Sequence, residues 1–333
     1  LPRDLLAPWC LHAGLGPDSA FSGEMARVIA FALEAAGAPI VKGGAERVAE
    51  AFRAIIEENG GRVRTGADVT GIDVTGGKAT GVTLATGEMI AAGKSVIAST
   101  APGQLYERLL TREVAGPKRE EARKYRHGKA NFQMHYALHG LPDWGNEALS
   151  DVALLHLTPG LDGVSKAVNE AERGLLPAEP TICVGQPHRA DPSRCPEGKA
   201  ILWLQMPEAP RVIKGDAAGE IMPPRDGRWS PEVAEAYADR IESRLRAHIR
   251  NFDAIKGTRR VISPAELEAL NINLVGGDPY GGAATIDQFF LWRPFSDSVN
   301  HKTHVPNLYH IGASTHPGPG LGGGSGLLLA NTL

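Results

Sequence analysis

The chain has 333 residues, 42% of them hydrophobic and 22% charged, with a formal net charge of −3. This length and hydrophobic content allow a large core and predict two domains. The scattered Lys and Arg residues do not favour a nucleic-acid partner, which would require a basic face. No apolar stretch reaches the roughly 20 residues of a transmembrane segment, and a peripheral membrane contact stays open.

Three widely spaced cysteines without a CxxC pair (Cys10, Cys183 and Cys195) predict free thiols, a reducing compartment and a cytoplasmic location. No metal site is predicted, because the HxxH at 301–304 has no third ligand nearby. The chain begins without Met or signal-peptide features and ends within an apolar run typical of the first turns of a helix. We therefore expect residues to be missing at both ends.

The first third of the chain changes its hydrophobic period. Residues 22–39 and 43–61 have helical periodicity, with Gly37 and Gly60 as stop signals. Short β-branched runs separated by glycine turns then predict strands at Val63, 69–74, 80–84 and 96–98. Helix, meander and buried strand together indicate an α/β arrangement.

A second set of elements follows a charged helical region at 101–126. Strands are predicted at 130–140, 181–186 and 200–207, and helices at 164–174 and 231–252. A Gly- and Pro-rich loop at 207–230 is expected to be exposed. The chain ends in a strand around 307–311, a glycine run at 312–326 and the opening of a helix.

The glycine run lies between a strand and a helix N-terminus, where α/β sheets bind ligands. Glycines allow the backbone to approach a ligand closely, and free N–H groups at a helix start favour an electron-rich or anionic group. Prolines and His316 inside the run argue against a flexible tail. Gly318, Gly320 and Gly323 match GxGxxG, but several residues separate them from the strand and no second strand follows, so they are not interpreted as a dinucleotide fingerprint.

Three segments in this order resemble the phytoene-desaturase-like flavoproteins. They are "NLYHIGASTHPGPGLGGGSG", the stretch from "VKGGAERVAEAF" to "VIASTAP", and "GGDPYGGAATIDQFFLWRP". The last looks most like the branch called pyridine nucleotide-disulfide oxidoreductase domain-containing proteins. The resemblance covers about residues 39–333 and implies non-covalently bound FAD.

The fold class that we expect is α/β, with an incomplete doubly wound, Rossmann-like FAD-binding domain and an α+β substrate domain with a mixed sheet. The predicted domains are 1–105 (central part of the FAD-binding domain), 106–300 (substrate domain) and 301–333 (return to the FAD-binding domain). Two departures from the family accompany this prediction. Pro319 stands where the family usually has Gly, and the N-terminal βαβ with its glycine fingerprint is absent, so a missing segment or a partner chain would complete the site.

The resemblance also implies roles for particular residues. The turn after the last strand would approach the ribityl and pyrophosphate part, the amides at 321–323 would face the flavin pyrimidine, and residues near 69 and 100–102 would lie near the adenine half. The implied cofactor-binding residues are Val69, Ala101, Pro102, Gly312, Ala313, Ser314, Leu321, Gly322 and Gly323.

The remaining candidates have structural alternatives. His316 is the best candidate for a catalytic contact at the flavin edge or substrate, and the alternative is a loop histidine bonded to backbone. Gln288 and Trp292 are predicted to line the substrate pocket or to pack the strand. Arg293 is the third predicted substrate-pocket residue. It would hold a carboxylate or the flavin, or else form a surface or inter-domain ion pair.

The predicted function is an FAD-dependent oxidoreductase that takes hydride from a C–H bond of a largely apolar substrate onto flavin N5. The electron acceptor is open among oxygen, a quinone and other acceptors. The first alternative is a non-catalytic relative or fragment without cofactor, acting through protein contacts. The second is a flavin enzyme that acts on amines.

Overall fold

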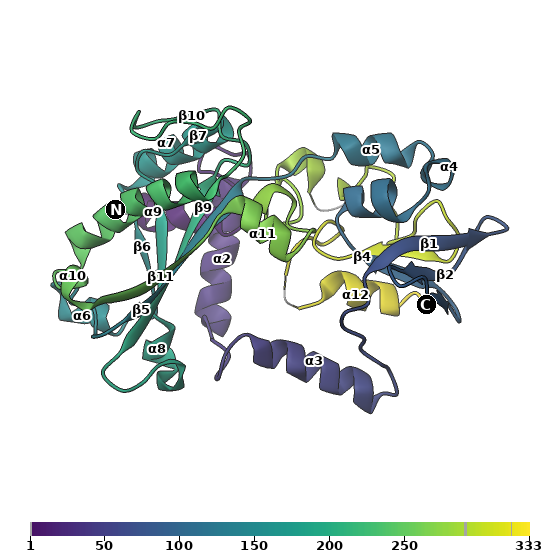
Figure 1. Ribbon diagram of the computed structural model, residues 1–333, viewed down its shortest axis with the longest axis horizontal. Helices are drawn as coiled ribbons and strands as arrows, with labels where there is room; N and C mark the ends of the chain where they lie inside the picture. Colours follow the sequence, from purple (N-terminus) through teal and green to yellow (C-terminus); the bar gives the residue numbers. More distant parts are fainter. Residues whose placement is uncertain (1, 290–291, 321) are drawn as a thin grey trace. The chain divides into compact units, whose positions relative to one another are not determined.

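The computed structural model describes residues 2–289, 292–320 and 322–333 (Figure 1). The backbone forms two compact units. Unit 1 contains the residues up to Val63 together with Lys129–Leu267, and unit 2 contains Arg64–Gly128 together with Glu268–Leu333. The chain thus crosses between units three times. The units divide at 63/64, 128/129 and 267/268, whereas the predicted domain boundaries are 105/106 and 300/301.

Unit 1 is built on a five-stranded sheet in the order β11-β5-β9-β8-β6. Each neighbouring pair in it is antiparallel. The strands are β5 (Ala130–Leu138), β6 (Leu154–Leu157), β8 (Ile182–Gly185), β9 (Ala200–Ala209) and β11 (Lys256–Ile262), and a separate parallel pair joins β7 (Leu175–Leu176) to β10 (Gly215–Asp216).

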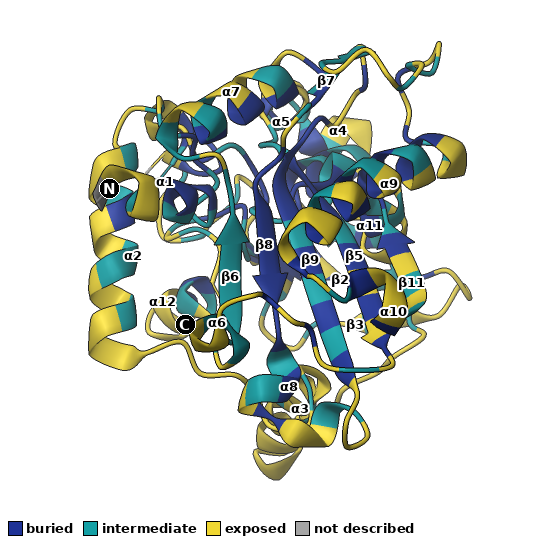
Figure 2. Ribbon diagram, turned by 90° about the vertical axis from the view of Figure 1, so that its left-hand side faces the viewer, coloured by how far each residue is buried: buried dark blue, intermediate teal, exposed yellow. Residues whose placement is uncertain are grey.

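One face of this sheet is covered by α9 (Pro231–His248), whose Tyr237, Ile241 and Leu245 are completely buried. They pack in one cluster with alternate residues of β5 and β9, such as Phe132 and Leu204. Figure 2 shows β8 buried along its length and α9 exposed on its outer side. The residues at steps of four along α9 therefore pack against the residues at steps of two along the strands.

The N-terminal helices of unit 1 are α1 (Pro2–Leu11), α2 (Ser22–Ala36) and α3 (Glu46–Glu58). Cys10 and Leu11 of α1 are buried against Val168 of α7 (Leu161–Glu172), which explains why this segment belongs to unit 1. The predicted helix α3 is confirmed, and Gly60 after it has φ +78°. Its apolar residues are exposed; Phe52, for example, is 52% exposed.

Unit 2 contains the antiparallel meander β1 (Val69–Thr75), β2 (Lys78–Leu84) and β3 (Met89–Ala91), and a parallel pair of β4 (Val96–Ser99) with β12 (Leu308–Ile311). Its helices are a π-helix η1 (Gln104–Leu109), α4 (Arg112–Ala115), α5 (Lys118–Lys124) and α12 (Gly324–Ala330), with 3₁₀ turns η3 (Val275–Gly277) and η4 (Ile286–Gln288). Leu105, Leu109 and Leu308 are central to its core.

The remaining helical segments are short. They are α6 (Glu147–Ser150), α8 (Pro187–Ala190), η2 (Pro192–Arg194), α10 (Phe252–Ile255) and α11 (Pro264–Leu270). None of the helices in the described part of the chain combines the length and hydrophobicity that a bilayer span requires.

The α/β class is confirmed, and so are the predicted meander, the three predicted strands of unit 1 and the strand–helix ending. The strand expected at Val63 is wrong, because residues 61–64 take neither helical nor strand structure. The sheet expected to be mixed is antiparallel throughout its five strands. The loop at 207–230 is not wholly exposed, since Ile213 and Trp229 are buried.

Candidate functional site

The parallel strands β4 and β12 end together at one edge of their sheet. Leu308 pairs with Val96 and Ile311 pairs with Ser99. The residues after both strands, Thr100–Pro102 and Gly312, are therefore brought to the same edge, where α/β sheets bind their ligands. Two segments that are about 210 positions apart in the sequence and were predicted to share a cofactor are thus adjacent.

Gly312 allows the sharp turn at the end of β12. Its φ is +103°, and a Cβ at this position would lie 2.9 Å from the Oγ of Ser99. Its amide donates to the Oγ of Ser325, in the first turn of α12, at 3.0 Å. Its carbonyl accepts from the amide of Thr315 at 3.0 Å. Glycine is required here by both backbone conformation and close packing.

The next residues of the turn are fixed by a buried hydrogen-bond network. The Oγ of Ser314 and the Oη of Tyr125 both donate to the carbonyl oxygen of Gly281, at 2.7 and 2.8 Å. A Cβ on Gly281 would lie 2.9 Å from that of Ala313. The segment "DPYGGAA" therefore packs directly beneath the turn, and Ser314 is buried.

Beyond this turn the chain forms what we call the glycine arm, residues 315–326. Leu321, one of the predicted cofactor residues, lies outside the described residues. Gly322 and Gly323 are exposed, and no acceptor for their amides lies in the described part of the chain. Gly323, with φ +63°, is the N-cap of α12, but a Cβ on Gly320, Gly322 or Gly326 would meet no atom within 4 Å. Neither conformation nor internal packing therefore explains these three glycines.

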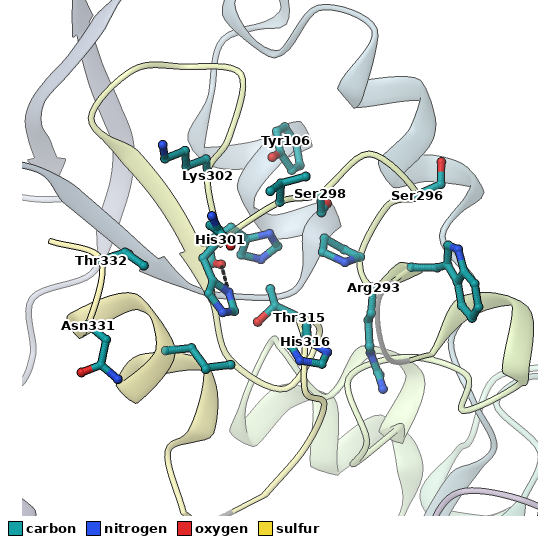
Figure 3. Close-up of a pocket in the computed structure, with 16 residues that line it drawn as sticks. Tyr106, Arg293, Ser296, Ser298, His301, Lys302, Thr315, His316, Asn331 and Thr332 are labelled. Carbon is teal, nitrogen blue, oxygen red and sulfur yellow. Dashed lines mark hydrogen bonds between the residues drawn. The ribbon is translucent and has the colours of Figure 1, made fainter.

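The arm borders a cavity of about 640 Å³ within unit 2 (Figure 3). Its described lining residues are Tyr106, Trp292, Arg293, Pro294, Ser296, Ser298, Val299, Asn300, His301, Lys302, His310, Thr315, His316, Leu328, Asn331 and Thr332. The described lining contains two permanent cations, Arg293 and Lys302, and no carboxylate. Such a lining favours an anionic or electron-rich occupant.

Three histidines contribute to the cavity wall. The Nδ1 of His301 lies 3.2 Å from the carbonyl oxygen of His310, and the Nε2 of His310 lies 2.7 Å from that of Thr100. Burial lowers the pKa of His310 to about 4, so this imidazole is neutral at pH 7. Its Nε2 must therefore donate to Thr100.

His316, the best catalytic candidate from the sequence, lines this cavity (Figure 3). Its Nδ1 is buried and has no hydrogen-bond partner among the described residues. No bond to backbone is found at this atom, and the catalytic role of His316 stays a prediction. A buried nitrogen without a partner is costly, so Nδ1 is available to a hydrogen-bonding group.

Arg293 is 1% exposed. It donates from Nε to the Oη of Tyr125 at 3.1 Å, and from Nη2 to the carbonyl oxygens of Tyr280 and Gly282 at 2.6 and 3.0 Å. The ion-pair alternative is wrong, because no carboxylate contacts it among the described residues. Its Nη1 is buried without a partner there.

The two other pocket candidates differ from each other. Trp292 is 47% exposed and lines the cavity. Gln288 does not line it: its side chain accepts from the amide of Arg126 at 3.0 Å and donates to the carbonyl of the same residue at 2.7 Å. Both polar groups of Gln288 therefore hold main chain.

Of the residues expected near the adenine half, Ala101 and Pro102 are buried at the edge described above. The Ala101 amide donates to the Oδ1 of Asn273 at 2.8 Å. Val69 begins β1, and its carbonyl oxygen accepts from Arg108 at 3.1 Å. Val69 is therefore on a different sheet from the β4–β12 edge.

The sequence analysis missed Tyr106, His301, Lys302 and His310 as cavity residues. The HxxH at 301–304 was considered only as a metal motif, although its first histidine faces the cavity. The available signal was the placement of His301, Lys302 and His310 within ten residues, before and within the last strand.

The β4–β12 edge, the glycine arm and the cation-lined cavity together form a candidate site for an anionic ligand at the ends of parallel strands. Residues 9–228 match the family described as flavin containing amine oxidoreductase, and the chain belongs to this family. The description of the family names the flavin and the oxidoreductase class that the sequence analysis predicts.

Curated relatives carry the resemblance further. The chain is 29% identical over 321 residues to a phytoene desaturase (lycopene-forming) from a Paracoccus species, covering 94% of this chain and 58% of that protein. It is 27% identical over 176 residues to pyridine nucleotide-disulfide oxidoreductase domain-containing protein 2 of Mus musculus, covering 53% of this chain and 27% of that protein. The predicted phytoene-desaturase-like resemblance is confirmed, and the chain spans only part of these relatives.

Among solved structures, an oxidoreductase from Methanosarcina mazei superposes with a TM-score of 0.56 at 14% identity. The superposition covers 99% of this chain and 64% of that one. It supports the shared fold.

Proposed function

We propose that the chain forms part of an FAD-dependent oxidoreductase that removes hydride from a C–H bond of a largely apolar substrate. The name of the Paracoccus relative specifies desaturation of phytoene, a hydrocarbon, and that similarity extends over 94% of this chain. No observation favours the non-catalytic alternative. The electron acceptor stays open.

The observation that carries the proposal is the group of unexplained glycines in the arm. A side chain at Gly320, Gly322 or Gly326 would meet only open space within the described structure. Isolated glycines such as Gly93 also meet nothing within 4 Å, but three such glycines within seven residues, where a strand leads into a helix, suggest close approach by an external group. A flat ring stacked or edge-on against main chain would meet this requirement.

The polar groups around the arm fit a flavin dinucleotide. The cations of the cavity and the absence of a carboxylate from its described lining would attract a pyrophosphate. The exposed amides of Gly322 and Gly323 would donate to electron-rich oxygen or nitrogen atoms of the flavin pyrimidine. Flavin, when bound, supplies the hydride-accepting position for such a reaction.

Roles for the other residues belong to the same proposal. The turn Gly312–Ala313–Ser314 would hold the ribityl and pyrophosphate part, and Ala101, Pro102 and Val69 would lie on the adenine side. Trp292 would form an apolar wall for the substrate. His316 would contact the flavin edge or the substrate through its unpartnered Nδ1.

The cofactor part is tested by purifying the natural full-length protein and recording its absorption spectrum. The wild type is expected to retain flavin. Gly322→Val is expected to lose most of it, because a side chain would occupy the space of the ring. Gly93→Val is the matched control, since Gly93 also meets nothing within 4 Å but lies in the turn before β4.

A wild-type protein that stays colourless with added FAD would contradict the proposal. Equal flavin content in Gly322→Val and Gly93→Val would contradict the role of the glycine arm in binding flavin. It would leave the flavin dependence of the protein itself untouched.

The substrate class is tested by anaerobic mixing with a polyene precursor hydrocarbon and, separately, with primary amines. Bleaching of the flavin absorption by the hydrocarbon is expected. If the amines bleach the flavin and the hydrocarbon does not, the proposed apolar substrate is wrong and the amine alternative holds.

We also propose a cytoplasmic location. Cys10, Cys183 and Cys195 are all free thiols, as expected in a reducing compartment. Fractionation of the source cells tests this, and recovery outside the cytoplasm would contradict it.

A further inference from the structure

Unit 1 contains a cluster of two imidazoles and a thiol outside the site described above. His156 on β6 pairs directly with Cys183 on the antiparallel strand β8. Opposed residues in such a ladder project from the same face. His12, which follows α1, reaches this face, and its Nε2 lies 2.8 Å from the Nε2 of His156.

The three side chains offer ligand atoms in one small volume. One nitrogen of each histidine and the Sγ of Cys183 all lie within 4.8 Å of one another. The ring of Trp9 forms a wall beside them, with its centroid 4.9 Å from that of His156 in an edge-on arrangement. Sequence patterns could not reveal the cluster, because its members are 27 to 171 positions apart.

The side chains supply the atoms that metal binding requires. A neutral imidazole offers a nitrogen lone pair, and a thiol becomes a ligand when the metal displaces its proton. Cys183 is buried and free, and no hydrogen-bond partner for its thiol lies in the described part of the chain.

We propose that His12, His156 and Cys183 bind one zinc-like divalent cation through two imidazole nitrogens and one thiolate. Nitrogen and sulfur donors select zinc over magnesium or calcium, and three protein ligands leave a fourth tetrahedral position for water. Binding replaces the S–H bond of Cys183 by a sulfur–metal bond and releases that proton to solvent. The ion would join α1 to the β6–β8 edge of the sheet.

The rival arrangement is a hydrogen-bonded pair of neutral histidines without an ion, for which 2.8 Å is an ordinary distance. In that arrangement one Nε2 carries the proton and donates to the other. The thiol of Cys183 would then serve only as an apolar filler. Metal titration separates the two.

The experiment is Co²⁺ titration of the purified holoprotein, followed in the red at wavelengths beyond the flavin absorption. The wild type is expected to take up one equivalent with the intense ligand-field bands of tetrahedral cobalt, and Zn²⁺ should displace it. His12→Gln and Cys183→Ser should each lose the bands. Cys195→Ser should keep them, because its thiol lies outside the cluster and donates to the Lys199 carbonyl at 3.3 Å.

Absence of saturable bands in the wild type would overturn the proposal, as would unchanged bands in folded His12→Gln and Cys183→Ser. Circular dichroism reports whether each variant is folded. X-ray absorption of the zinc-loaded wild type needs no variant. One sulfur at about 2.3 Å with nitrogen or oxygen neighbours supports the site, and a shell without sulfur refutes it.

Discussion

The hydroxyl of Ser325 accepts a hydrogen bond from the amide of Gly312 at 3.0 Å. Ser325 lies in the first turn of α12, and Gly312 follows the last residue of β12. This single bond ties the end of the strand to the start of the helix across the glycine arm. It therefore fixes both ends of the segment to which we assign the flavin.

Ser325→Ala is expected to destabilise unit 2 by about 1–3 kcal/mol, because the Gly312 amide loses its acceptor. Flavin should also dissociate at a lower temperature. Urea unfolding and the temperature of flavin release measure the two effects. Ser243→Ala is the control, since its hydroxyl bonds a carbonyl on the exposed side of α9; a similar loss in both variants would contradict the role of Ser325.

Gly312→Ala is expected to cost about 1–3 kcal/mol in the free energy of unfolding. The cause is twofold: φ is +103°, and the new Cβ would lie 2.9 Å from the Oγ of Ser99. Gly93→Ala should cost little, because Gly93 has neither a positive φ nor a neighbour within 4 Å. Chemical denaturation of both variants gives the comparison, and equal stability of the two would refute the packing argument.

Arg293→Met should lower the free energy of unfolding by about 1–3 kcal/mol. The substitution removes the donor to the buried carbonyl of Gly282 and one donor to the part-buried carbonyl of Tyr280. Arg112→Met, at an exposed position of α4, is the control and should be close to neutral. If Arg293 is instead used for cofactor binding alone, the apoprotein of Arg293→Met would be as stable as the wild-type apoprotein.

Acid should destabilise unit 2 through His310. Its folded pKa of about 4 lies below its ordinary value of 6.5, so the unfolded chain binds more protons between these values. The contribution of the neutral ring to the free energy of unfolding is fully present above pH 6.5. It is lost as the pH falls toward 4, a change of about 3 kcal/mol. His301 and the Thr100 carbonyl, which face the ring, supply no negative charge to oppose this.

Denaturation of wild type and His310→Gln across this pH range measures the effect as a difference between the two proteins. The difference is needed because Glu208 has the opposite effect on the pH dependence of stability. Burial raises the pKa of Glu208 to about 7, so its contribution to the free energy of unfolding falls as the pH rises. Parallel pH profiles of the two proteins would show that His310 is not titrating as argued.

The sequence by itself determined most elements of the fold. The step of four along α9, the β-branched runs of the meander and the glycine stop at Gly60 are local signals, since each depends on neighbours within a few residues. The same holds for the strand, glycine run and helix at the end of the chain. The class of protein followed from their order and from the family resemblance.

The tertiary structure decided what long-range packing controls. Single-residue strand signals such as Val63 carry no information on pairing, and the grouping of α1 with α7 depends on contacts about 160 positions apart. Gln288 and Arg293 looked alike as pocket candidates, yet one holds the main chain of Arg126 and the other the Tyr280–Gly282 loop. Only the tertiary structure places His310 and His316 at one cavity, and His12 beside His156 and Cys183. Contact between residues that are distant in the sequence depends on the topology of the fold and not on a local pattern.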